Sequence, residues 1–231
     1  MAYREWDTSV PGVVLWRSAA GSAPALILPD GCLDLIWDGR QLLVAGPDTA
    51  ARWHRGLPAS HYTALRFSHG LGPALLGVPA DSLTDQSIAL VDLWPPALAE
   101  RLTQQVAVDP VGALSTWLAA RAASHAETAD PLGARLFPLA AAGLPVAKMA
   151  DAFGLSARQL HRRCLPVFGY GPRRLARVLR LLRAVEQGRT GRPLAEVATG
   201  AGFYDQAHLS REVRALVGLT PTELLVARNP E

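Results

Sequence analysis

Two short segments in the C-terminal third carry side chains that could read the edges of DNA bases. The first holds Arg158, Gln159, His161 and Arg162, and the second holds Gln206, Ala207, His208, Ser210 and Arg211. Arginine pairs with guanine, glutamine with adenine, and the alanine methyl contacts the thymine methyl in the major groove. At helical spacing these residues share the polar face of two helices, which predicts direct contact with duplex DNA.

The two segments belong to a pattern of about thirty residues that occurs twice, at 144–175 and 192–224. The second copy follows at an offset of 48 up to the turn glycine and of 49 afterwards, so it contains one inserted residue. Each copy reads as a short helix, a glycine turn at Gly154 or Gly202, and a second helix. We expect two helix-turn-helix units whose second helices enter the groove.

Capping residues, prolines and turn glycines predict where these helices lie. We expect helices over 145–153 and 157–165, with Pro166 ending the latter, and over 193–199 and 205–216. A spacer over about 171–187 joins the units, spanning about 24 Å at about 1.5 Å per residue. Asp130-Pro131 opens this part with a helix kinked or interrupted at Pro138, and Thr220-Pro221 starts a final helix.

Further arginines are candidates for phosphate contacts: Arg163, Arg173, Arg174 and Arg177. The spacer arginines are expected to form a solvated face that also feels the DNA backbone. For Arg162 and Arg211, base contact stands beside two alternatives, a phosphate clamp and an intramolecular ion pair. His161 and His208 are expected to point outward, either toward DNA or simply into solvent.

Charge is divided unevenly along the 231 residues. Residues 144–231 hold 14 Lys and Arg against 7 Asp and Glu, a net of +7, whereas residues 1–143 have a net of −4. Only the C-terminal part is therefore expected to meet a polyanion. No apolar run reaches the length of a bilayer span, so we expect a cytoplasmic protein without a membrane partner. Cys32 and Cys164 form no disulfide framework or metal motif, and no cofactor is expected.

The N-terminal part reads as short strands and turns. Candidate strands are 12–17, 25–28, 32–37, 41–45 and 61–67, with Asp38-Gly39 as a tight hairpin. This spacing favours a small barrel or sandwich. Helical periodicity begins at Ala97 and resumes after Pro110, and 122–129 is the expected linker.

Several N-terminal side chains could face an effector: Asp30, Cys32, Asp34, Trp37, His54 and His61. Asp34 alternates with Cys32 on one strand face, where a carboxylate could meet a polar ligand. The alternative is that strand alternation simply turns these residues toward solvent or core. A DNA-binding domain fused to a metal-dependent cupin-type enzyme is a second hypothesis, but the histidines lack a tight ligand pair.

The order of unit, spacer and unit, with the second copy ending in GFYDQAHLSREVRALVGLTPTEL, resembles the AraC/XylS family of bacterial transcription regulators. The likeness covers about 130–225, and its signature is G-F-x-D-x-x-H-x-S-R followed by G-x-T-P. It implies that Arg158, His161, Arg162, Ala207, His208 and Arg211 occupy base- or backbone-contacting positions. Cys164 departs from the family's usual bulky aromatic, whereas Val213 at the matching place remains apolar. The N-terminal segment is similar to the small β-rich domain of one subgroup.

We therefore expect an α+β multidomain chain: a β-rich, barrel-like sensor or dimerisation domain over 1–95, a helical connection over 96–129, and an all-α tandem helix-turn-helix domain over 130–231. The expected function is sequence-specific transcription regulation rather than catalysis. The expected partners are double-stranded DNA, a small-molecule effector and RNA polymerase, with the chain a monomer or homodimer.

Overall fold

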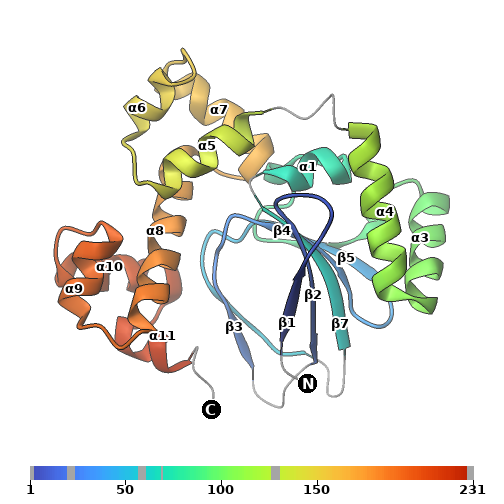
Figure 1. The fold of residues 1–231 in the computed structure, drawn as a ribbon, viewed down its shortest axis with the longest axis horizontal. Coiled ribbons are helices and arrows are strands. Elements are labelled where there is room, and N and C mark those ends of the chain that lie inside the picture. The colour runs from blue at the N-terminus through green and yellow to red at the C-terminus, as the bar shows by residue number, and fades with distance from the viewer. Residues whose placement is uncertain (1–2, 20–23, 57–60, 69, 126–130, 228–231) are drawn as a thin grey trace.

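The computed structural model describes residues 3–19, 24–56, 61–68, 70–125 and 131–227. Strands with a few helices form the N-terminal part, and helices alone form the C-terminal part (Figure 1). This confirms the predicted fold class. Among the described residues, no helix is both long and apolar enough to cross a membrane.

Six antiparallel strands form the main sheet in the order β1-β2-β7-β4-β5-β8. Their bounds are β1 (Arg4–Asp7), β2 (Val13–Ala19), β4 (Leu33–Trp37), β5 (Leu42–Ala45), β7 (His61–Phe67) and β8 (Ser87–Ala89). Strands β1 and β8 are the two edges, so the sheet is open, although a barrel-like closure was expected. The predicted hairpin is confirmed: Gly39 has a positive φ of 92°, and the Asp38 amide donates to the Gln41 carbonyl.

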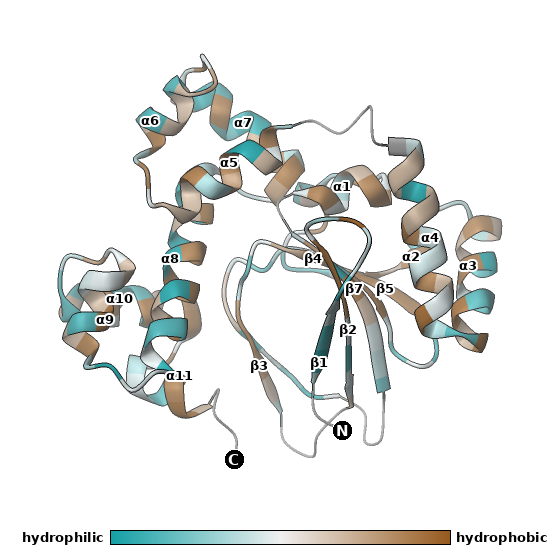
Figure 2. Ribbon diagram, in the orientation of Figure 1, coloured by the Kyte–Doolittle hydropathy of each residue, from teal (hydrophilic) through white to brown (hydrophobic). Residues whose placement is uncertain are grey.

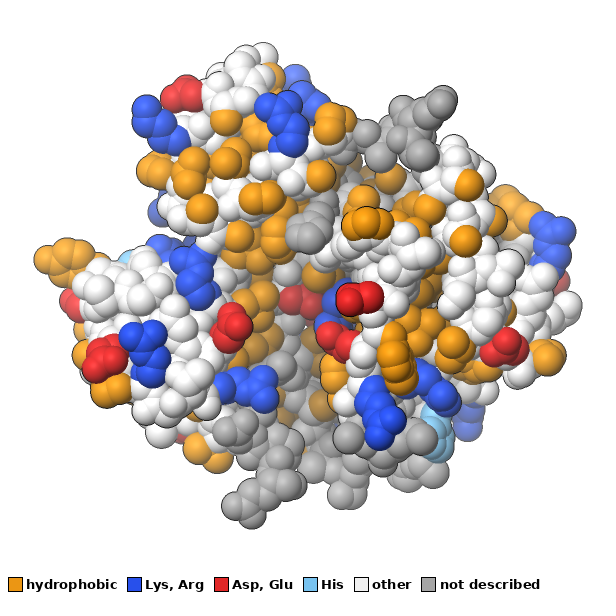
Figure 3. Space-filling model, in the orientation of Figure 1, with side chains coloured by type: hydrophobic (Ala, Val, Ile, Leu, Met, Phe, Trp, Pro, Cys, Tyr) orange, Lys and Arg blue, Asp and Glu red, His pale blue; other side chains and the backbone are white. Residues whose placement is uncertain are grey.

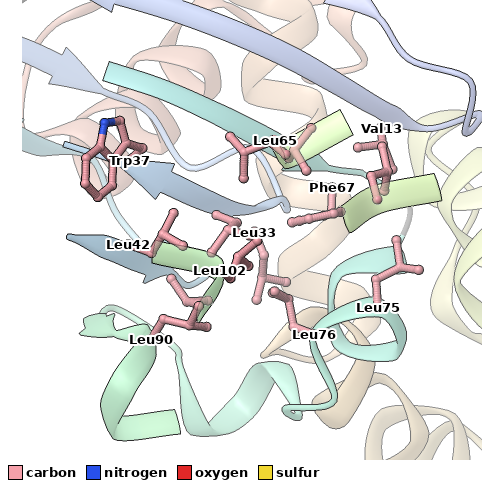
Figure 4. Close-up of a cluster of buried hydrophobic side chains, with 14 of the residues drawn as sticks. Val13, Leu33, Trp37, Leu42, Leu65, Phe67, Leu75, Leu76, Leu90 and Leu102 are labelled. Carbon is pink, nitrogen blue, oxygen red and sulfur yellow. The ribbon is translucent and has the colours of Figure 1, made fainter. Parts of the chain in front are cut away.

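Alternation along the strands gives this sheet two different faces. One face carries Leu33, Leu35 and Trp37 from β4 and packs with Leu65 and Phe67 of β7 (Figure 4). It is covered by α1 (Leu71–Leu76), α2 (Leu90–Leu93), α3 (Pro96–Val108) and α4 (Pro110–His125), with a 3-10 turn at Ala80–Ser82. The helices α3 and α4 thus share one core with the sheet. The other face carries Trp16, Asp34 and Arg66.

A separate two-stranded ribbon pairs β3 (Ala25–Ile27) with β6 (Arg52–His54). The sequence patterns missed β1, β6 and β8, because runs of three or four residues give too little alternation to stand out. Leu26 and Leu28 of the ribbon segment pack into the core of the second helix-turn-helix unit. The N-terminal part therefore contributes apolar side chains to the C-terminal part.

Seven helices build the C-terminal part over residues 131–227. Their bounds are α5 (Leu132–Ala141), α6 (Val146–Asp151), α7 (Ala157–Phe168), α8 (Pro172–Gly188), α9 (Leu194–Ala201), α10 (Gln206–Val217) and α11 (Pro221–Ala227). Helices α6 and α7 form the first unit, α9 and α10 form the second, and α8 connects them (Figure 1). Helix α8 alternates apolar and polar residues along its length (Figure 2), with Leu175, Val178 and Leu181 buried.

Pro166 does not end its helix, although the sequence predicted that it would: α7 continues past Pro166 to Phe168. Helix α5 contains Pro138 and runs on to Ala141. Pro166 lies in the last turn of α7, where its missing N–H removes only one intrahelical hydrogen bond. The burial of Phe168 and the hydrogen bond from the Gly169 amide to the Leu165 carbonyl hold that last turn in place.

Polar contacts also join the two parts. The Ala51 amide donates to the Leu216 carbonyl at the end of α10 (2.7 Å), and the Thr84 hydroxyl donates to the Gly169 carbonyl (3.1 Å). Gly169 has a positive φ of 74°, and a Cβ atom there would lie 2.5 Å from Pro47 Cγ. Only glycine permits this close approach. The end of α7 is thereby fixed against the N-terminal part.

Candidate nucleic-acid interface

Helix α7 begins with a reciprocal capping box. The Gln159 amide donates to the Ser156 hydroxyl (3.2 Å), and the Ser156 amide donates to the Gln159 side-chain oxygen (2.9 Å). The helix buries Leu160, Cys164 and Phe168 and exposes Arg158 and Arg162. The amide oxygen of Gln159 is therefore engaged at the cap.

Helix α10 also begins with a side-chain cap, which here is one-sided. The Asp205 carboxylate accepts from the His208 amide at 2.6 Å and caps the helix, which buries Leu209, Val213 and Leu216. The predicted contact residues Gln206, Ala207 and Arg211 are exposed, and Ser210 is half-buried with its hydroxyl donating to the Gln206 carbonyl (2.9 Å). Cys164, which departs from the family pattern, and Val213 at the matching place in the second unit are both buried.

Both predicted histidines contact neighbouring parts of the protein. A Cβ atom on Gly171 would lie 2.2 Å from His161 Cδ2, so this ring rests on the chain just before α8. His208 Nδ1 accepts from the Tyr204 amide (3.2 Å), and its ring meets Phe203 edge-on at 5.4 Å between centroids. These contacts hold each recognition helix against its turn.

Three arginines on the recognition helices remain available. Within the described residues, Arg158, Arg162 and Arg211 form no ion pair or hydrogen bond with the rest of the chain, and all three are exposed. An exposed guanidinium with all its donors unused suits a guanine edge or a phosphate. Their contact with DNA stays a prediction.

The phosphate candidates divide into two groups. Arg163 and Arg173 are exposed. Arg177 instead donates to Glu212 on α10 through Nε (2.8 Å) and Nη2 (3.2 Å), and Arg174 donates to the Thr49 carbonyl (3.0 Å). The expected solvated face of the spacer is thus partly taken up by internal contacts.

Arg180 and Arg183, further along the same helix, also bind the second unit. Arg180 lies over the Phe203 ring (4.9 Å to the centroid) and donates to the Gly202 carbonyl (3.3 Å), while Arg183 donates to the Ala201 carbonyl (3.4 Å). Burial raises the pKa of Glu212, but the hydrogen bond from Arg177 and the nearby arginine charges hold it below its usual value. The spacer helix therefore fixes the orientation of α10 electrostatically.

One exposed aromatic residue was missed by the sequence analysis. Tyr204 is 90% exposed and directly precedes the cap residue Asp205. The Leu155 amide donates to the Ala150 carbonyl, and the Phe203 amide donates to the Ala198 carbonyl, so Leu155 and Phe203 occupy matching positions. The next matching residues are the helix caps Ser156 and Asp205. Tyr204, between Phe203 and Asp205, is therefore the inserted residue of the second unit. The change of offset from 48 to 49 was the signal that could have identified it.

The effector candidates do not form one group. Asp30, Cys32 and Asp34 lie together: the Cys32 amide donates to Asp30 (2.9 Å), and both carboxylates lie near Arg66 Nε, at 3.6 Å from Asp30 and 3.2 Å from Asp34. Trp37 is buried on the opposite face of the sheet, because it is an odd number of residues from Asp34. Arg66 was missed, although it is the only Lys, Arg, Asp or Glu residue in its strand.

The two histidines lie outside this cluster. His54, on β6, meets Tyr62 edge-on at 5.9 Å between ring centroids, and His61 is exposed at the start of β7. Burial lowers the pKa of His54. His69 lies outside the described residues. Within the part of the chain that the structure describes, no three His, Cys, Asp or Glu residues are grouped as metal ligands.

Two family models match this chain, one in each part. Residues 149–226 match the family model of a helix-turn-helix domain, and residues 12–89 match a domain of unknown function (DUF6597). A search of curated proteins gave no match. A probable AraC family transcriptional regulator from Rhodopseudomonas palustris CGA009 is 23% identical over 44% of this chain and 100% of its own, with a TM-score of 0.37.

Two structures of ToxT from Vibrio cholerae strain SCE256 extend over nearly the whole chain. An apo form is 10% identical and covers 96% of this chain and 100% of its own, with a TM-score of 0.51. The unsaturated fatty acid bound wild-type form is 11% identical, covers 93% and 94%, and has a TM-score of 0.48. The apo form is thus similar to this chain in overall fold.

Proposed function

We propose that this chain, whose residues 149–226 match a helix-turn-helix domain, is a transcription regulator of the AraC/XylS family that reads two neighbouring stretches of one duplex, with α7 and α10 in successive major grooves. The observation that carries this proposal is the pair of capped recognition helices joined by α8, each with exposed guanidinium groups. Helix α8 has 17 residues and spans about 26 Å at about 1.5 Å per residue. Successive major grooves on one side of a duplex are about 34 Å apart, so a strut of this length suits the task.

We assign base contacts first to Arg158, Arg162 and Arg211. Their side chains have no competing partner among the described residues, whereas Gln159, His161 and His208 also serve the local fold. Arg163 and Arg173 are the candidates for phosphate contacts. Arg174 and Arg177 act instead by positioning the helices, because their donors are engaged inside the protein.

The second unit makes the larger contribution in this proposal. Its recognition helix is tied to the spacer through Glu212, and Tyr204 adds an aromatic ring at the helix start. The N-terminus of a recognition helix enters the groove, so a ring at that end lies beside the sugar-phosphate backbone. The first unit has no equivalent residue.

The N-terminal part is proposed to modulate DNA binding. Its two-stranded ribbon packs on the core of the second unit, and the Ala51 amide donates a hydrogen bond to the Leu216 carbonyl at the end of α10. A small molecule or a second copy of the chain that altered these contacts would change the position of one recognition helix relative to the other. Such a ligand would bind one arrangement of the chain more tightly than the other and so shift the equilibrium between them.

Selection from random double-stranded DNA tests the two-groove reading. We expect a bipartite site whose two short motifs are centred about one helical turn, about 10 base pairs, apart. Inserting five base pairs between the motifs should then abolish specific binding, while inserting ten should weaken it less. Selection of a single motif would sink the proposal.

A further inference from the structure

A charged cluster lies on the face of the main sheet that the N-terminal helices leave uncovered. Asp34 on β4 is the register partner of Arg66 on β7, and Glu5 on β1 is the partner of Trp16 on β2. Figure 3 shows acidic and basic side chains together at a hollow beside β1, toward the C-terminal helices. The cluster therefore faces the region between the two parts of the chain.

Acidic groups outnumber basic groups in this cluster. The Arg66 guanidinium lies 3.2 Å from Asp34, 3.6 Å from Asp30 and 3.5 Å from Glu5. Three carboxylates thus share one cation, and the Arg66 and Asp34 side chains are largely shielded from water. An excess of negative charge in a shielded place disfavours the free protein unless a cation joins it.

A buried hydroxyl without a partner borders the same cluster. Tyr170 is only 5% exposed, and its hydroxyl makes no hydrogen bond with any residue that the structure describes. That hydroxyl lies 3.4 Å from the position of a Cβ atom on Gly31, between Asp30 and Cys32. Buried polar atoms are nearly always paired, so an orphan hydroxyl beside surplus carboxylates indicates a missing polar partner.

We propose that Asp30, Asp34 and Tyr170 bind a small organic cation, a primary amine or a guanidinium compound. Its N–H groups would donate to the two carboxylates and to the Tyr170 oxygen, forming charge-assisted hydrogen bonds. Trp16 lies alongside, with its indole N–H donating to Asp34 (2.8 Å) and its ring already beneath the Arg66 guanidinium (5.9 Å to the centroid), so it orients the Asp34 carboxylate. A metal ion is disfavoured because the described residues contain no group of three His, Cys, Asp or Glu suited to one.

The site joins elements that are distant in the sequence. Asp30 and Asp34 belong to the N-terminal part, whereas Tyr170 lies between α7 and α8. A bound cation therefore strengthens the contact between the sheet and the end of the first recognition helix. This inference deepens, and rests on, the proposed control of DNA binding by a small molecule.

Calorimetric titration of the full chain without DNA tests the site. Agmatine and putrescine are the probes, and 1,4-butanediol is the uncharged control. We expect saturable binding and a raised melting temperature with at least one amine and neither with the diol. Tyr170→Phe should weaken amine binding about five- to tenfold, as loss of one hydrogen bond implies. Absence of binding by both amines would overturn the proposal.

The melting temperature of the free protein supplies a second, independent test. Asp30→Asn keeps an oxygen that can accept from the Cys32 amide but removes one surplus charge. We expect this variant to lose amine binding and to melt no lower than the parent, with exposed Asp81→Asn as the matched control. A lower melting temperature with amine binding retained would make the cluster structural and overturn the site. DNA affinity, measured separately, distinguishes failure of this site from failure of the DNA-binding proposal.

Discussion

Arg177, in the helix between the two units, forms a two-point ion pair with Glu212 in the second recognition helix. The distances are 2.8 Å from Nε to Oε2 and 3.2 Å from Nη2 to Oε1, and both side chains are half-buried. Because a two-point pair fixes angle as well as distance, it sets how α10 sits on α8. The charge of this spacer arginine thus orients the second recognition helix even in the absence of DNA.

Glu212→Gln should destabilise the protein by about 1–2 kcal/mol, since it leaves a half-buried guanidinium with a weaker partner. Urea unfolding monitored by circular dichroism measures this loss. Glu196→Gln is the matched control, because Glu196 pairs with Arg192 at a more exposed position and should change stability by less than about 0.5 kcal/mol. Equal effects of the two substitutions would contradict the positioning role of Glu212.

Arg211→Ala should weaken specific DNA binding by about 10- to 100-fold, whereas Arg183→Ala should have a much smaller effect. Arg211 is exposed on the recognition helix and has no partner among the described residues, while Arg183 donates to the Ala201 carbonyl. A good base contact contributes about 1–3 kcal/mol of discrimination. Fluorescence anisotropy with cognate and random duplexes measures both. If Arg211→Ala reduced the two affinities equally, Arg211 would be a phosphate contact.

Tyr204→Ala should weaken DNA binding about three- to tenfold and leave the melting temperature unchanged, because the side chain is 90% exposed. Tyr204→Phe separates the ring from its hydroxyl and should retain most of the affinity. The comparison variant is Leu155→Ala, which removes a partly buried side chain at the turn of the first unit. It should lower the melting temperature. Unchanged DNA affinity of Tyr204→Ala would rule out this contact.

The stability advantage of the parent protein over Asp34→Asn should shrink as pH rises from about 4 to about 6. Burial raises the pKa of Asp34 to about 6, and Arg66 only partly opposes this. The unfolded carboxyl titrates near about 3.9, so the folded state holds the proton more tightly and loses stability as pH climbs through that window. Urea unfolding of both proteins across the range measures the difference. Parallel curves would contradict a raised pKa for Asp34 in the folded protein.

The sequence by itself determined the helix-turn-helix units, because their signals are local. Cap residues, turn glycines and helical periodicity each act within a few residues, and the duplication presents them twice. The exposure of Arg158, Arg162 and Arg211 follows from the same periodicity. The family resemblance likewise depends on a run of adjacent residues in the second unit.

The tertiary structure decided which polar side chains have partners. Arg177 meets Glu212 across 35 positions of the chain, and Arg66 meets Asp34 across 32. No local pattern encodes such pairs, because packing brings the elements together. Burial of Phe168 likewise carries α7 past Pro166, against the local preference of proline. The orphan hydroxyl of Tyr170, and with it the proposed cation site, exists only where the two parts of the chain meet.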